Sequence, residues 1–211
     1  MDVLKEIARL LAAGEDQQAR TLTQTAVDRQ IPAKKILDEG LIAGMNRVGE
    51  LFRCQEIFLP EVLLAARAMY AGLEVLKPLL IKEQVESPGK VVIGTVQGDM
   101  HDIGKNLVGI MLRGAGFDVV DLGNDVAPER FVETAVREQA SVIGMSALLT
   151  TTMPAMKRTV ELLKTKGLAG RIRTIIGGAP VTPEYARSIE ADAYGYDAAN
   201  AVDQVKKLML R

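Results

Sequence analysis

The stretch that decides the fold of this chain is Gly98-Asp99-Met100-His101-Asp102-Ile103-Gly104-Lys105-Asn106. It holds the only histidine of the 211 residues, and it closely follows the β-branched run 91–96. Such a run is typical of a buried parallel strand, and the glycines beside the histidine predict a turn into a helix that begins near Ile103. Ligands of an open α/β sheet bind at the carboxyl ends of its strands. His101 therefore lies where a site is expected, although a single histidine near a helix start can equally be a surface or capping residue.

Two later strand ends strengthen the case for a site. The apolar run 142–149 breaks into a hydroxyl-rich turn at residues 150–152, and the run 174–176 ends in the paired glycines Gly177 and Gly178. Each stretch stands at the carboxyl end of a predicted strand. Together the three stretches point to one edge of one sheet.

From Lys90 onward the sequence alternates between strand and helix patterns. Strands are predicted at 91–96, 117–121, 142–145, 174–176 and 193–194. Helices are predicted at 103–115, 128–138, 154–166, 183–189 and 198–210, and proline opens three of them. This alternation indicates a parallel sheet with helices on both faces.

Residues 1–82 carry helical periodicity and almost no strand signal. The first helix is predicted to end at Gly14, a second to cover 16–29, and two more to begin at Pro32 and Pro60. Four helices with short joints indicate a small bundle. The polar stretch 83–90 reads as a linker. The predicted organisation is thus a helical domain over 1–82, a linker over 83–90 and a second domain over 91–211.

Composition excludes several classes of protein. The net charge of −1 argues against a dedicated nucleic-acid surface. The amino terminus lacks a signal-peptide pattern, and no apolar run approaches the roughly 18 residues of a membrane span. The single cysteine, Cys54, excludes an internal disulfide and a thiolate metal cluster. We therefore expect a soluble cytoplasmic protein that binds neither nucleic acid nor membranes.

Three motifs follow one another along the chain, each at the end of a predicted strand: Asp-x-His-x-x-Gly at 99–104, Ser-x-Leu at 146–148, and Gly-Gly at 177–178. Their succession resembles the signature of cobalamin-binding proteins. The whole chain is similar to the corrinoid proteins of anaerobic methyltransferase systems and to the matching module of cobalamin-dependent methionine synthase. The resemblance implies an α/β fold, in which an N-terminal four-helix bundle cap precedes a Rossmann-like, doubly wound, parallel five-stranded sheet.

The resemblance also implies a cofactor, namely cobalamin as methylcobalamin or a related corrinoid, with its cobalt. His101 would be the lower axial cobalt ligand and would replace the cofactor's own benzimidazole base. Neutral imidazole is a common ligand for such metals, and Asp99 would accept a hydrogen bond from the other ring nitrogen. The family's third member of this proton relay is a serine. Here Thr152 stands in its place, so the hydroxyl is kept and a methyl group is added.

Other residues are implied to surround the cofactor. Ser146 would contact the buried base, Thr150 the nucleotide tail, and Phe52 and Leu59 of the cap would cover the upper cobalt face. Without the resemblance, these two side chains would read as ordinary core. The remaining residues that match the cofactor-binding segments are Gly98, Met100, Asp102, Ile103, Gly104, Leu148, Gly177, Gly178 and Ala198.

The function implied is methyl carriage, in which cobalt alternates between Co(I) and methyl-Co(III). The chain would be a non-catalytic corrinoid subunit between a substrate:corrinoid methyltransferase and an acceptor methyltransferase, and a reductive activase is a further candidate partner. The sequence leaves the donor open among methylamines, methanol and methoxylated aromatics, and the acceptor between a folate and a thiol. Two alternatives stay open: a cobalamin-dependent sensor or regulator, and the small subunit of a cobalamin mutase. The first calls for an output module and the second does not call for a helical cap.

Overall fold

The computed structural model describes residues 2–210, which fall into two compact units. Within the described residues, 2–86 with 114–116 form the first, which we name the helical unit. Residues 87–113 with 117–210 form the second, which we name the sheet unit. None of the helices within residues 2–210 is both long and apolar enough to cross a membrane.

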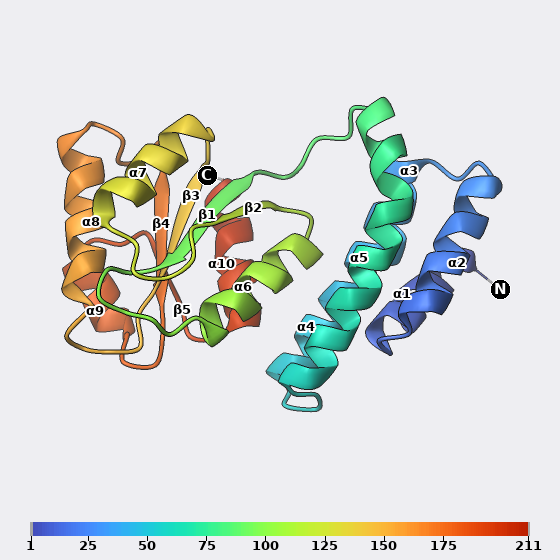
Figure 1. The fold of residues 1–211 in the computed structure, drawn as a ribbon, viewed down its shortest axis with the longest axis horizontal. Coiled ribbons are helices and arrows are strands. Elements are labelled where there is room, and N and C mark those ends of the chain that lie inside the picture. The colour runs from blue at the N-terminus through green and yellow to red at the C-terminus, as the bar shows by residue number, and fades with distance from the viewer. Residues whose placement is uncertain (1, 211) are drawn as a thin grey trace. The chain divides into compact units, whose positions relative to one another are not determined.

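The helical unit is built entirely from helices and the turns between them (Figure 1). They are α1 (Val3–Ala12), α2 (Asp16–Asp28), α3 (Ala33–Ile36), the π-helix η1 (Leu37–Ile42), α4 (Ala43–Arg53) and α5 (Leu59–Lys82). Asp2 caps α1 by accepting a hydrogen bond from the Leu4 N–H at 3.1 Å. Helices approach closely at Gly72, where a Cβ would come within 2.6 Å of Leu41 Cδ2. A larger residue there would displace the Leu41 side chain or the helix that carries it.

One helix of this unit differs from the prediction. The sequence predicts a single helix from Pro32 through Phe52, whereas the structure divides that stretch into α3, η1 and α4. A π-helical turn accommodates one more residue than an α-helical turn. Gly40 lies within η1, and a Cβ at this position would come 3.2 Å from Ile7 Cγ2 of α1. The π-helix therefore contains a point at which the chain passes closely over α1.

The sheet unit alternates strand and helix throughout. Its elements are β1 (Lys90–Thr95), α6 (Ile103–Gly114), β2 (Asp118–Asp121), α7 (Pro128–Arg137), β3 (Val142–Ser146), α8 (Pro154–Thr165), β4 (Arg173–Gly177), α9 (Pro183–Ser188), β5 (Ala193–Gly195) and α10 (Ala198–Met209). All neighbouring strands are parallel, in the order β2-β1-β3-β4-β5. The chain leaves β1 toward one edge and returns at β3 toward the other. The carboxyl ends of β1 and β3 are thus the switch point at which doubly wound sheets bind ligands.

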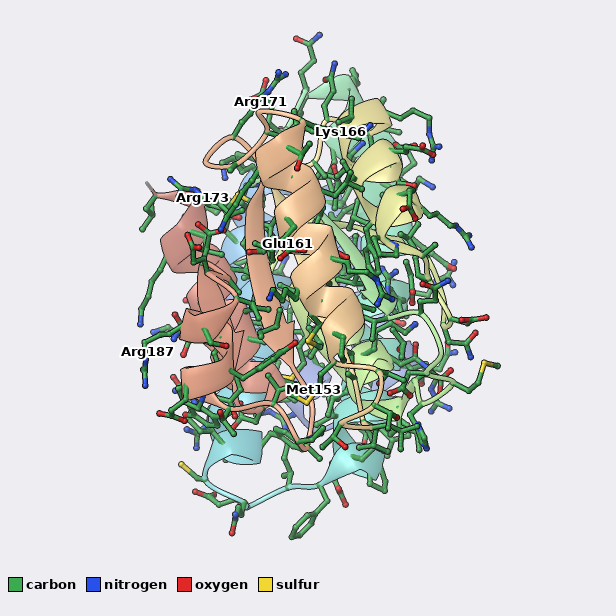
Figure 2. All side chains as sticks on the ribbon, turned by 90° about the vertical axis from the view of Figure 1, so that its left-hand side faces the viewer. Met153, Glu161, Lys166, Arg171, Arg173 and Arg187 are labelled. Atoms are coloured by element: carbon green, nitrogen blue, oxygen red, sulfur yellow. The ribbon has the colours of Figure 1, made fainter. Side chains whose placement is uncertain are left out.

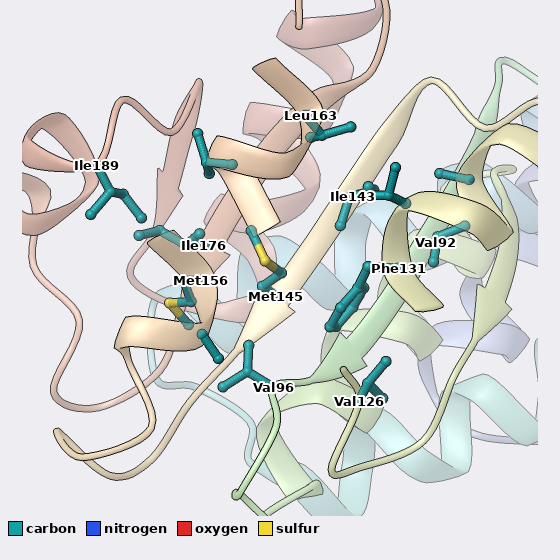
Figure 3. Close-up of a cluster of buried hydrophobic side chains, with 14 of the residues drawn as sticks. Val92, Val96, Val126, Phe131, Ile143, Met145, Met156, Leu163, Ile176 and Ile189 are labelled. Carbon is teal, nitrogen blue, oxygen red and sulfur yellow. The ribbon is translucent and has the colours of Figure 1, made fainter. Parts of the chain in front are cut away.

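The core of the sheet unit lies between the sheet and helices α7, α8 and α9 (Figure 3). Phe131 of α7 is fully buried against β1, because Gly94 has no side chain there and a Cβ would lie 2.8 Å from the ring. Figure 2 shows α8 between Met153, the residue before it, and Lys166, the residue after it. The Tyr185 hydroxyl donates a hydrogen bond to Met153 O at 2.7 Å, which joins α9 to the start of α8.

The predicted fold class is confirmed: a helical N-terminal region precedes a five-stranded, all-parallel sheet with helices in between. The predicted strands and helices of the sheet unit end within one or two residues of the observed ones. On its surface, the exposed side chain of Arg187, labelled in Figure 2, pairs with the exposed Glu184. Exposed pairs of this kind contribute little to stability.

Candidate functional site

The centre of the site is Asp99, a fully buried carboxylate that follows β1. Its Oδ1 accepts hydrogen bonds from His101 Nδ1 at 2.7 Å and from the His101 N–H at 3.1 Å. Its Oδ2 accepts bonds from the N–H groups of Leu148 and Leu149 at 2.8 and 3.2 Å, and from Thr152 Oγ1 at 2.8 Å. One side chain therefore joins the loop after β1 to the loop after β3, at the switch point of the sheet.

These bonds fix the charge of Asp99. Burial alone would raise the pKa of this carboxyl, but the Leu148 N–H, the side chain and N–H of His101 and the Thr152 hydroxyl outweigh it. Together they hold the pKa of Asp99 well below its usual range. An ionised carboxylate can only accept hydrogen bonds, so His101 Nδ1 must carry the proton. In the neutral imidazole this leaves Nε2 as a lone-pair donor, on a side chain that is 51% exposed.

Thr152 lies at the predicted place and contributes through both of its branches. Its hydroxyl is 2.8 Å from Asp99 Oδ2 and 2.8 Å from Leu149 O, so its one proton can be donated to either oxygen. Its methyl carbon lies 3.4 Å from the place that a Cβ of Gly98 would occupy, so the glycine leaves room for this methyl group. The methyl group that distinguishes Thr152 from serine is therefore accommodated without displacing the hydroxyl.

The paired glycines have a structural reason of their own. A Cβ at Gly177 would lie 2.8 Å from Gly195 O, and one at Gly178 would overlap Ala147 O. Gly178 also has φ +126°, a conformation that side chains rarely adopt. These glycines let the ends of β3, β4 and β5 approach one another. Their contact with a cofactor tail stays a prediction.

Exposed apolar side chains gather after the carboxyl ends of the strands. Met100 and Ile103 follow β1, Leu148 and Leu149 follow β3, and Tyr196 follows β5. Leu149 and Tyr196 were not among the predicted site residues, although Leu149 lies between two of them and Tyr196 lies two residues before Ala198. Beside Met100 and Ile103, a Cβ at Gly104 would meet nothing within 4 Å. These residues place apolar side chains at the same edge of the sheet as His101.

The other predicted residues lie as follows. Ser146 ends β3 and is half-buried, Thr150 is exposed in the following loop, and Ala198 is the buried first residue of α10. Phe52 and Leu59 lie in the helical unit, in the last turn of α4 and the first turn of α5, and both are half-buried. That they cover a cofactor stays a prediction.

Two observations test whether these residues fit a corrinoid. Within residues 2–210, no group of three or more His, Cys, Asp or Glu side chains could hold a metal ion. A single protein ligand such as His101 suits a metal that carries its other ligands in a macrocycle. In the first turn of α10, Asn200 Oδ1 is buried and has no hydrogen-bond partner among the described residues. A polar group of a bound ligand would satisfy that oxygen, so the residues present fit the cofactor.

The fold and site thus define a doubly wound protein in which a histidine, held by a buried carboxylate, lies at the switch point of the sheet. Comparisons with known proteins agree. Residues 89–205 match the family model described as "B12 binding domain", and residues 3–77 match a second model with the same description. The chain belongs to the B12-binding family.

Among its relatives, dimethylamine corrinoid protein 1 of Methanosarcina acetivorans is 43% identical over 99% of this chain and 98% of the relative. Trimethylamine corrinoid protein 1 of Methanosarcina mazei is 44% identical over 93% of this chain and 92% of the relative. Among solved structures, a chain of the methanol:cobalamin methyltransferase complex from Methanosarcina barkeri matches with a TM-score of 0.86. It is 31% identical and covers 99% of this chain and 80% of that one. The family's cofactor is a corrinoid, as the sequence predicts.

Proposed function

We propose that this chain is a corrinoid methyl carrier that works between a substrate:corrinoid methyltransferase and an acceptor methyltransferase. The observation that carries the proposal is the arrangement of Asp99, His101 and Thr152 at the switch point, with His101 Nε2 left as a lone-pair donor. The relatives named above, which carry corrinoid and methyltransferase in their names, support it. A reductive activase is a third proposed partner. Methylamines and methanol are the first donors to test, since they occur in those names.

When bound, the corrinoid supplies a cobalt atom that accepts a methyl group and gives it up again. His101 would hold that atom through Nε2. Asp99 keeps the proton of the imidazole on Nδ1, and the amides of Leu148 and Leu149 keep Asp99 charged. The Thr152 hydroxyl can donate its proton to either Asp99 or Leu149 O. Its hydrogen bond can therefore switch between these two acceptors when the charge of the imidazole changes.

The rest of the chain is proposed to support this centre. Ser146, Thr150, Gly177, Gly178 and Ala198 would line the nucleotide tail. Residues 1–82 would act as a cap, joined through 83–90 to the cofactor domain 91–211. Closing an active site in this way excludes water and side reactions from a reactive centre.

Reconstitution of the purified protein with cobalamin tests the proposal. We expect binding of about one cobalamin per chain with the benzimidazole displaced, seen as histidine nitrogen coupling in the electron paramagnetic resonance spectrum of the Co(II) state. The control is His101→Ala, which should keep much of the affinity and lose that coupling, since most contact area lies elsewhere. A wild-type spectrum with benzimidazole on cobalt would refute the proposal.

A further inference from the structure

The His101 loop (residues 98–102) is held by a second loop that the motifs do not include. This is the β2–α7 loop, residues 122–127. Asp125 Oδ1 accepts a hydrogen bond from the Gly98 N–H at 2.8 Å, and the Asp125 N–H donates one to Asp99 O at 3.0 Å. We propose that Asp125 is a positioning residue that holds the His101 loop in the shape that receives the corrinoid. This inference rests on the proposed function.

The backbone at both ends of the contact is unusual. Asp125 has φ +50° and Gly98 has φ +85°, so both lie in the left-handed region. Glycine adopts this region freely, whereas a residue with a side chain does so at a cost. Asp125 is exposed, so core packing does not impose its conformation. The two hydrogen bonds to the His101 loop are the interactions that the conformation secures.

The β2–α7 loop is itself fixed to the sheet. The Thr95 N–H donates to Gly123 O at 2.9 Å, and the Val126 N–H donates to Thr95 O at 3.0 Å. Upstream, Asp121 accepts a hydrogen bond from the Gly123 N–H at 2.9 Å. Asp121 also forms an ion pair at 2.6 Å with Nζ of Lys105, whose side chain is only 5% exposed. Asp125 is therefore held on a support that does not involve the His101 loop.

The same support reaches His101 from other directions. The buried Thr95 hydroxyl donates to His101 O at 2.8 Å, and Asn124 Nδ2 donates to Met100 O at 3.3 Å. Backbone groups at all four positions from Gly98 to His101 are thus held. A loop ordered before the ligand arrives loses no conformational freedom on binding. Removing the Asp125 side chain shifts that ordering cost to the binding step.

Three variants separate the hydrogen bond from the backbone strain. Asp125→Gly removes the carboxylate and adopts φ +50° without strain. Asp125→Asn keeps an acceptor oxygen and tolerates the left-handed region. The matched control is Asp118→Asn at the exposed amino end of β2, which changes the net charge by the same amount far from the His101 loop.

Two measurements decide the matter. In the apoprotein, hydrogen exchange of the Gly98–Asp102 amides should be about tenfold faster in Asp125→Gly, with the rest of the sheet unit unchanged. In the reconstituted protein, cobalamin should bind about tenfold more weakly and the Co(II) spectrum should show heterogeneous nitrogen coupling. Asp125→Asn should restore most of both properties, and Asp118→Asn should match the wild type.

The inference is overturned if Asp125→Gly matches the wild type in both measurements, or if Asp118→Asn shows the same losses. Faster exchange spread evenly over the sheet unit also overturns it, since that pattern reports fold stability. If wild-type protein binds no cobalamin, the proposed function fails, while the exchange measurement still decides whether Asp125 orders the loop.

Discussion

Asp99→Asn changes one oxygen into an NH₂ group, at a place where every donor and acceptor is known. Asp99 accepts hydrogen bonds from five donors, two at Oδ1 and three at Oδ2. The amide oxygen of asparagine must face the larger set, from Leu148, Leu149 and Thr152. The NH₂ group then faces His101 and can donate to Nδ1 only if that nitrogen carries no proton. We expect the neutral imidazole to move its proton to Nε2, which would remove the proposed cobalt ligand.

The cost in stability follows from the same bonds. A hydrogen bond to a charged group contributes about 1.5–3 kcal/mol and one between neutral groups about 1 kcal/mol. Three bonds lose their charge, and the His101 N–H loses its acceptor. We expect the free energy of unfolding of the apoprotein to fall by about 3 kcal/mol at neutral pH, measured by urea unfolding.

The tautomer can be read directly, because the chain has a single histidine. Nitrogen NMR of protein labelled at His101 separates the protonated from the unprotonated ring nitrogen. The wild type should show the proton on Nδ1 and the variant on Nε2. A variant that keeps the proton on Nδ1 would refute the reasoning, and so would unfolding free energies that agree within error.

Further outcomes follow from other features. Because the pKa of Asp99 is lowered in the folded protein, its contribution to stability is complete above about pH 4, the ordinary pKa of an aspartate. That contribution is lost as the pH falls through the folded-state pKa. Acid unfolding should show this loss in the wild type and not in Asp99→Asn. Thr152→Val should lower the free energy of urea unfolding by about 1–2 kcal/mol because it removes the hydroxyl donor, whereas Thr152→Ser should lower it by less. Gly178→Ala should destabilise the sheet unit by roughly 3 kcal/mol or more, seen as a lower melting temperature by circular dichroism; an unchanged melting temperature would contradict the overlap with Ala147 O. Joint truncation of Phe52 and Leu59 to Ala should speed photolysis of bound methylcobalamin and leave its affinity largely intact, provided that circular dichroism shows the helices still folded; an unchanged photolysis rate would make both residues ordinary core.

The sheet unit could be predicted closely because its signals are local. β-Branched runs, glycines after strands and prolines at helix starts each act within a few residues, and the observed elements end within one or two residues of the predicted ones. The π-helix Leu37–Ile42 could not be predicted in this way. Apolar periodicity identifies a helix there, but it is the same for an α-helix with or without one π-helical turn, so it gives no signal for the extra residue.

The site, too, could be predicted from the sequence only in part. The motifs predicted the joint placement of Asp99, His101 and Thr152, which the structure brings within hydrogen-bonding distance. They did not reveal the backbone amides that keep Asp99 ionised, because every residue except proline has an N–H and only the fold decides where that N–H points. Asp125 was missed for a related reason: its role depends on a left-handed backbone in a loop 27 residues from Gly98.

The amides of Leu148 and Leu149 also bear on how this loop can change during evolution. Main-chain donors are the same whatever side chain they carry, so substitutions at 148 and 149 can reshape the surface after β3 without altering the charge of Asp99. Proline is the exception, because it has no N–H. The side chains at positions 148 and 149 can therefore change to suit differently shaped ligands while the hydrogen bonds that keep Asp99 acidic stay the same.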